Sequence, residues 1–137
     1  MGCYRLLEHT ADMGLEAWGK TRTELFIQAA LALREILVDK AIPTSENTVD
    51  IHVDGGDDAE CLVNWLAELV FLFECRHFLP ADFILKFKGD QLFARMTGQT
   101  FDPAHLPAER EVKAVTHHQV VAEETPQGWH GRVYLDL

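Results

Sequence analysis

The chain has 137 residues, of which 47% are hydrophobic; this suits one globular domain with a sizeable core and excludes intrinsic disorder. Lys and Arg total 12 against 22 Asp and Glu, giving a net charge of −10. With no basic run in the sequence, we expect little direct binding to nucleic acid, because phosphates are usually neutralised by clustered Lys and Arg. No apolar run approaches the ~20 residues of a membrane span, and the first residues do not resemble a signal peptide. The three cysteines have no CxxC spacing, and their odd number indicates neither a disulfide framework nor a zinc site. We therefore expect a cytoplasmic protein that does not bind membranes.

The first half of the chain predicts two strand–helix units. Residues 6–18 alternate as an extended segment does, and Thr21 and Glu24 form the capping box of a first helix. Residues 48–54 alternate again and end at Gly55-Gly56, and Asp57-Asp58 opens a second helix with acidic groups at its positive end. The apolar stripes of the helices comprise Leu25, Phe26, Ala29, Ala30, Leu33, Ile36 and Leu37 in the first, and Leu62, Val63, Leu66, Leu69, Val70 and Phe73 in the second.

The second half predicts strands. Residues 83–87 and 92–96 flank a hairpin turn at 88–91, and 101–110 is a proline-containing loop. Residues 112–123 indicate one long strand, and 129–137 a final strand after a turn at 126–128. This order predicts an α+β fold: a single domain over residues 1–137, with a mainly antiparallel β-sheet covered by two amphipathic helices.

Acidic groups gather at the end of the final strand. Val133 and Leu135 alternate with Asp136, so we expect Asp136 on the face opposite the core. The α-carboxylate of Leu137 lies close by, and carboxylates so placed repel one another unless they face water or share a cation. The alternative is a frayed terminus with a solvated aspartate.

Two other polar segments carry candidate residues. Residues 8–12 (Glu-His-Thr-Ala-Asp) fit a functional loop, although Asp12 also suits a turn and His9 a structural hydrogen bond. In residues 113–118, Lys113 could bind a ligand or protect an edge strand. The adjacent His117 and His118 point to opposite faces of a strand, and no further His or Cys completes a zinc site.

Independent catalysis has little support in the sequence. Gly55-Gly56 matches neither a P-loop nor a dinucleotide motif. Ser45 is the only serine, and it lies in a polar loop without the surroundings of a nucleophile.

The ordered set of motifs resembles the archease family over nearly the whole chain. The motifs are residues 8–12, Gly-Leu-Glu-Ala-Trp-Gly at 14–19, Glu-Leu-Phe at 24–26 with Ala29-Ala30, Leu-Val-Asn-Trp-Leu-Ala-Glu-Leu at 62–69, Gly98-Gln99, Val-Lys-Ala-Val-Thr at 112–116 and Arg-Val-Tyr-Leu-Asp-Leu at 132–137. The resemblance implies a non-catalytic protein cofactor of the RNA-splicing ligase that joins transfer-RNA halves. Such a protein promotes guanylylation of the ligase, supports its multiple turnover and widens its nucleotide use beyond GTP.

The resemblance also implies site residues. The family's metal ligands correspond to Asp12, Asp136 and Leu137, the last through a terminal or main-chain oxygen, and Lys113 and His9 are expected to contact the partner or a nucleotide. Oxygen ligands favour a hard cation, namely Ca²⁺, Mg²⁺ or Mn²⁺. Two positions depart from the family pattern, since His117 replaces a frequent aromatic residue and Leu137 a frequent isoleucine.

Two other function classes stay open at this point. A general chaperone or protein modulator fits the small size and the acidity. A metal-dependent phosphohydrolase would use Asp12 and Asp136, with Lys113 as electrophile.

Overall fold

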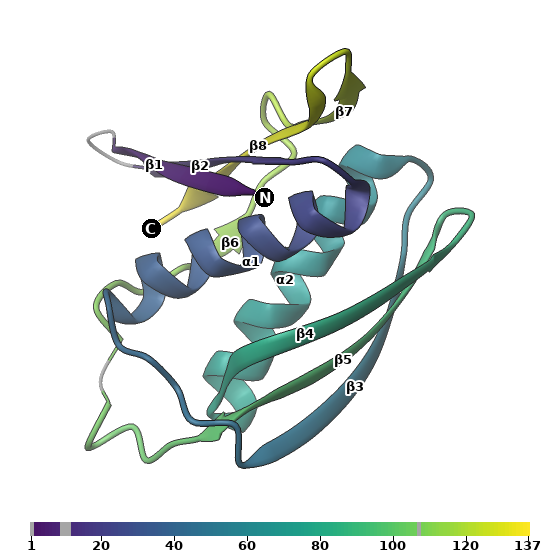
Figure 1. Ribbon diagram of the computed structural model, residues 1–137. Helices are drawn as coiled ribbons and strands as arrows, with labels where there is room; N and C mark the ends of the chain where they lie inside the picture. The colour runs from purple at the N-terminus through teal and green to yellow at the C-terminus, as the bar shows by residue number, and fades with distance from the viewer. Residues whose placement is uncertain (1, 9–11, 107) are drawn as a thin grey trace.

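Two antiparallel sheets enclose a pair of helices in the computed structural model, which describes residues 2–8, 12–106 and 108–137 (Figure 1). The five-stranded sheet has the order β1-β2-β8-β6, with β7 also paired to β8, and the three-stranded sheet has the order β3-β5-β4. The elements are β1 (Cys3–Glu8), β2 (Asp12–Gly19), α1 (Arg22–Val38), β3 (Asn47–Asp54), α2 (Asp58–Arg76), β4 (Phe78–Lys88), β5 (Gln91–Thr100), β6 (Ala114–Val115), β7 (Val121–Thr125) and β8 (Gly128–Asp136).

The predicted fold class is confirmed, but the division of the strands into two sheets was not predicted. Both helices and the antiparallel pairing are present, but the strands form two sheets, one on each side of the helices, where the sequence suggested one. The reason lies in α1, where seven of the ten residues from Ala29 to Val38 are buried and the other three are half-buried. A helix that is apolar on most of its circumference must be covered on more than one side.

The helices begin where their capping residues predict. The side chain of Thr21 accepts a hydrogen bond from the backbone N–H of Glu24 at 3.1 Å, and that of Asp57 accepts from the N–H of Glu60 at 2.8 Å. All the stripe residues predicted for both helices are buried. Trp65 of α2 is fully buried and donates its indole N–H to the carbonyl of Phe26 at 3.0 Å, which joins the two helices inside the core.

The prediction of one long strand over residues 112–123 is wrong. Two short strands, β6 and β7, pair with the same edge of β8. Val115 lies opposite Leu135 and Val121 opposite Arg132, so residues 116–120 loop out opposite residues 133 and 134 alone. Gln119 in this loop has a φ of 50°, a left-handed conformation that interrupts a strand.

The hairpin between β4 and β5 is confirmed, with strands longer than predicted and Gly89 in the turn at a φ of 61°. Among the described residues, no helix combines the length and the apolar character that a membrane crossing requires.

Candidate functional site

Asp12 and Asp136 are direct cross-strand partners in the five-stranded sheet. Their neighbours Met13 and Leu135 are at most 1% exposed and face the helices. Side chains alternate along a strand, so both carboxylates lie on the outer face of the sheet. The Cβ atoms of such partners are roughly 4.5–5.5 Å apart. The structure therefore brings together two acidic residues from opposite ends of the chain.

The C-terminal strand is held on both sides up to its penultimate residue. β8 lies between β2 and β6, and the backbone N–H of Lys113 donates to the carbonyl of Asp136 at 2.8 Å. Leu137 is half-buried and packs against the core. The strand is therefore not frayed, although Asp136 itself is exposed as the solvated-aspartate alternative expected, and Leu137 follows directly on the Asp12–Asp136 pair.

Lys113 belongs to the same end of the sheet. Its backbone is bound to Asp136, and its side chain is exposed immediately before β6. β6 is an edge strand, so a lysine here also limits pairing with other chains. This end of the sheet thus carries the carboxylates of Asp12 and Asp136 and the exposed side chain of Lys113.

Residues 108–110 reach this end of the sheet as well. Arg110 donates to the exposed carboxylate of Glu8 at 3.4 Å, and the N–H of Glu109 donates to the carbonyl of Leu37 at 2.6 Å. His9, a predicted site residue, lies outside the described residues.

An aromatic pair beside the carboxylates was not anticipated from the sequence. Tyr134 precedes Asp136 by two residues on the same face, and its ring covers Gly14, where an added Cβ would lie 2.8 Å from the tyrosine Cε1. The ring of His118 lies 6.1 Å from that of Tyr134. Finding this pair requires the register of β2 and β8, because only that register places a glycine opposite a tyrosine. Both His117 and His118 are exposed, and His118 has the ring contact with Tyr134.

A buried glutamate fixes the same strands further from the terminus. Glu16 is only 8% exposed and accepts from Arg5 of β1 at 2.7 Å, while His130 of β8 lies 2.6 Å away. Burial by itself raises the pKa of Glu16, but hydrogen bonds from His130 and Arg5 outweigh it and hold the pKa below its ordinary value. The side chains of Arg5 and His130 also lie against the ring of Trp18. These contacts resist a shift of register that would separate Asp12 from Asp136.

The donor set limits how a metal could be held. In the part of the chain that the structure describes, no three His, Cys, Asp or Glu side chains gather as a metal site would require. Asp12 and Asp136 supply two carboxylates, so a cation here needs its third protein ligand from the terminal carboxylate or the main chain. Such an all-oxygen set suits a hard divalent cation.

Comparisons with known proteins agree with this fold and with the resemblance seen in the sequence. The model of the archease protein family matches residues 4–137. The chain is 35% identical to protein archease of Methanosarcina barkeri, with 98% of this chain and 95% of the relative covered. It is 34% identical to protein archease of Methanopyrus kandleri, with 96% of each chain covered.

Solved structures show the same architecture. The solution structure of Methanobacterium thermoautotrophicum protein 1598 superposes with a TM-score of 0.81 at 28% identity, covering 98% of both chains. A crystal structure described as an archease and possible chaperone, from Thermotoga maritima, superposes with a TM-score of 0.66 over 96% of this chain and 94% of its own. At 19% identity, that second likeness concerns the fold alone. The sequence matches over the whole domain establish that this chain belongs to the archease family.

Proposed function

We propose that this protein is a non-catalytic activator of an RNA-splicing ligase, acting through a divalent cation held by Asp12, Asp136 and the terminal carboxylate of Leu137. It promotes guanylylation of the ligase, restores the ligase for repeated turnover and widens its use of nucleoside triphosphates. The observation that carries this proposal is the direct opposition of Asp12 and Asp136 on the outer face of the sheet. Membership of the archease family gives that pair its functional context.

The geometry of the pair supports cation binding. Like charges directly opposite each other on neighbouring strands are destabilising, and a shared cation would remove that cost. Asp12 is held in β2, and Asp136 is held between β2 and β6, so both ligands are positioned before a cation arrives. A bound cation would supply positive charge and open coordination positions for phosphate oxygens, since hard cations take six or more ligands.

Lys113 would act beside the cation. Its ammonium group is exposed at the same end of the sheet and can meet a phosphate of the ligase's nucleotide as a point charge. The net charge of −10 favours a protein partner with a positive surface over RNA itself. In this proposal the protein therefore contacts the ligase and its nucleotide, and the ligase contacts the RNA.

A general chaperone is the second candidate, because the Thermotoga maritima relative is described as a possible chaperone. A chaperone that binds many unfolded clients needs a broad apolar surface. Exposed large apolar side chains of the described residues are Ile42, Phe71, Ile84 and Phe93, and of these only Ile84 and Phe93 share a sheet face. Such scattered exposure supports this role less well.

The decisive experiment combines the purified protein with the ligase, RNA ends, GTP and Mn²⁺. We expect multiple turnover only when the protein is added, and a faster appearance of guanylylated ligase. Rescue of unrelated unfolded clients without any effect on the ligase would favour the chaperone instead. Release of phosphate by the protein alone would favour the phosphohydrolase.

A further inference from the structure

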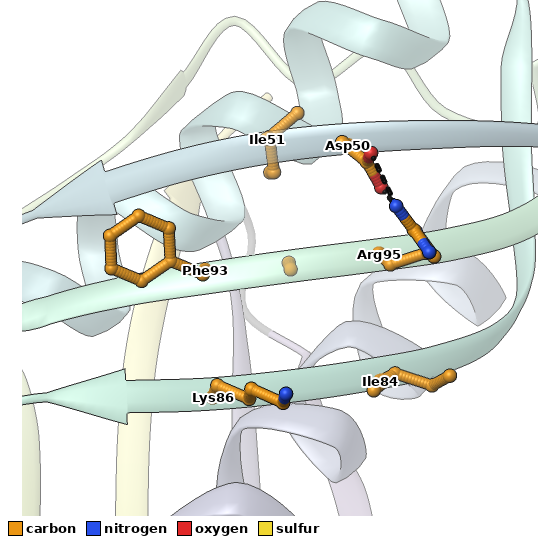
Figure 2. Close-up of a pocket in the computed structure, with 7 residues that line it drawn as sticks. Asp50, Ile51, Ile84, Lys86, Phe93 and Arg95 are labelled. Carbon is orange, nitrogen blue, oxygen red and sulfur yellow. Dashed lines mark hydrogen bonds and ion pairs between the residues drawn. The ribbon is translucent and has the colours of Figure 1, made fainter.

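The outer face of the three-stranded sheet is unusual among the surfaces of this protein. Side chains on this face alternate with buried ones along all three strands, and the face carries a hollow of about 500 Å³ bounded by Ile84, Phe93 and Arg95 (Figure 2). Ile84 is 62% exposed and Phe93 is 39% exposed. The outer β3-β5-β4 face consists of Thr48, Asp50, His52 and Asp54 from β3, Gln91, Phe93, Arg95 and Thr97 from β5, and Asp82, Ile84, Lys86 and Lys88 from β4.

The charges of this face are balanced. Three aspartates (Asp50, Asp54 and Asp82) are matched by three basic residues (Lys86, Lys88 and Arg95), although the whole chain carries −10. β3 contributes Asp50 and Asp54 at one edge, and β4 contributes Asp82, Lys86 and Lys88 at the other. Asp54 on one edge and Lys88 on the other lie at the same level of the sheet, so this end of the face is complementary to a copy of itself.

We propose that the outer β3-β5-β4 face binds a second copy of this chain, with the two copies related by a twofold axis parallel to β5. A twofold axis makes an interface in which the same patch is used by both copies. In this orientation β3 of one copy lies over β4 of the other, because rotation about β5 exchanges the two edges. Asp54 of one copy then lies over Lys88 of the other, and the two Phe93 side chains face each other.

The central side chains are arranged for such a contact. Arg95 is drawn toward β3 by a bidentate ion pair with Asp50, at 2.8 and 3.1 Å. In the facing copy the same pair leans toward the opposite edge, so the two guanidinium groups avoid each other. Phe93 is steadied by His52, whose ring stacks on it with centroids 4.5 Å apart. The centre therefore presents ordered apolar surface.

The dimer should be weak and should leave the carboxylate pair open. Strands about 4.8 Å apart with a rise of about 3.3 Å per residue give this face a projected area well under the roughly 800 Å² per partner of a standard interface. The helices separate the two sheets, so the Asp12–Asp136 pair points away from the dimer contact (Figure 1). Both copies could then engage a ligase at the same time.

Sedimentation of the full chain, from about 1 μM to about 1 mM, tests the proposal. We expect a reversible monomer–dimer equilibrium, and Ile84→Glu should raise its dissociation constant at least tenfold. Phe71→Glu is the matched control, because it places the same charge on an exposed apolar position of α2 and should leave the equilibrium unchanged. Thermal unfolding of each variant verifies that it is folded.

A charge exchange gives the sharper test. One variant, Lys86→Glu with Lys88→Glu, has two acidic edges, and the other, His52→Lys with Asp54→Lys, has two basic edges. Each should be monomeric alone, and an equimolar mixture should associate as the original chain does. A chain that stays monomeric throughout, or a dimer unaffected by Ile84→Glu, would overturn the proposal. Loss of ligase binding in Ile84→Glu, with a monomeric parent protein, would assign the face to the ligase instead.

Discussion

Removal of the Asp136 carboxylate separates a role in function from a role in folding. In Asp136→Ala we expect stimulation of the ligase to be lost while the fold is kept. The side chain is exposed on the outer face of β8, so no core volume disappears. Surface substitutions of this kind usually change stability by no more than about 0.5 kcal/mol. Relief of the repulsion with Asp12, worth about 0.2–1 kcal/mol for a cross-strand pair, acts in the stabilising direction.

A bound cation should stabilise the original protein and should leave the stability of Asp136→Ala unchanged. A ligand present at 100 times its dissociation constant stabilises the folded state by about 2.7 kcal/mol. For a chain of this length, 1 kcal/mol shifts the unfolding temperature by about 4 °C, so saturating cation should raise it by about 10 °C. Asp136→Ala should lose this increase and should unfold, in chelator, at nearly the temperature of the original protein. Asp12→Ala should behave alike, and the double variant should be no worse than either single one, because both residues serve one ion.

The assay pairs thermal unfolding, in chelator and in Ca²⁺ or Mn²⁺, with ligase turnover at saturating GTP. Glu74→Ala is the control, since it removes one exposed carboxylate from α2 and should alter neither readout. Full stimulation by a folded Asp136→Ala protein would refute the functional assignment. Unfolding of Asp136→Ala in chelator would instead make Asp136 a structural residue.

Three further predictions concern glycine packing, pH and RNA. Gly14→Ala should lower the free energy of unfolding, measured with urea, by about 1–3 kcal/mol, because the added Cβ would lie 2.8 Å from the ring of Tyr134. Gly56→Ala is the control and should be nearly neutral, because the nearest atom to its added Cβ lies at 4.0 Å. The lowered pKa of Glu16 stabilises the fold above the ordinary value of 4.5, and this contribution is lost as the pH falls through the folded-state pKa. The free energy of unfolding should therefore fall less steeply between pH 7 and pH 3 in Glu16→Gln than in the original protein. Equal slopes would show that the contacts of Glu16 with Arg5 and His130 do not stabilise the fold. The isolated protein should bind intron-cleaved transfer RNA weakly at physiological salt, because its charge is −10; sub-micromolar, salt-sensitive binding would show this reasoning to be wrong.

Local patterns determined the helices and most of the strands. The hydroxyl of Thr21 and the carboxylate of Asp57 bond to backbone groups three residues away, so the information for each helix start is contiguous. The apolar stripes depend on helical spacing alone, and every predicted member is buried. The outward position of Asp136 likewise followed from the alternation of β8.

Tertiary structure decided everything that depends on pairing between distant strands. The alternation of residues 112–123 resembles one strand, but the partner β8 offers two residues where the chain has five, and the excess must loop out. The division into two sheets is equally nonlocal, because a strand's own sequence does not specify its neighbour. Asp12 and Asp136 were assigned to one site through family resemblance, and only the register of β2 with β8 places them opposite each other. Composition and periodicity describe which face of an element is buried; which residues meet on the other face depends on the contacts of the whole chain.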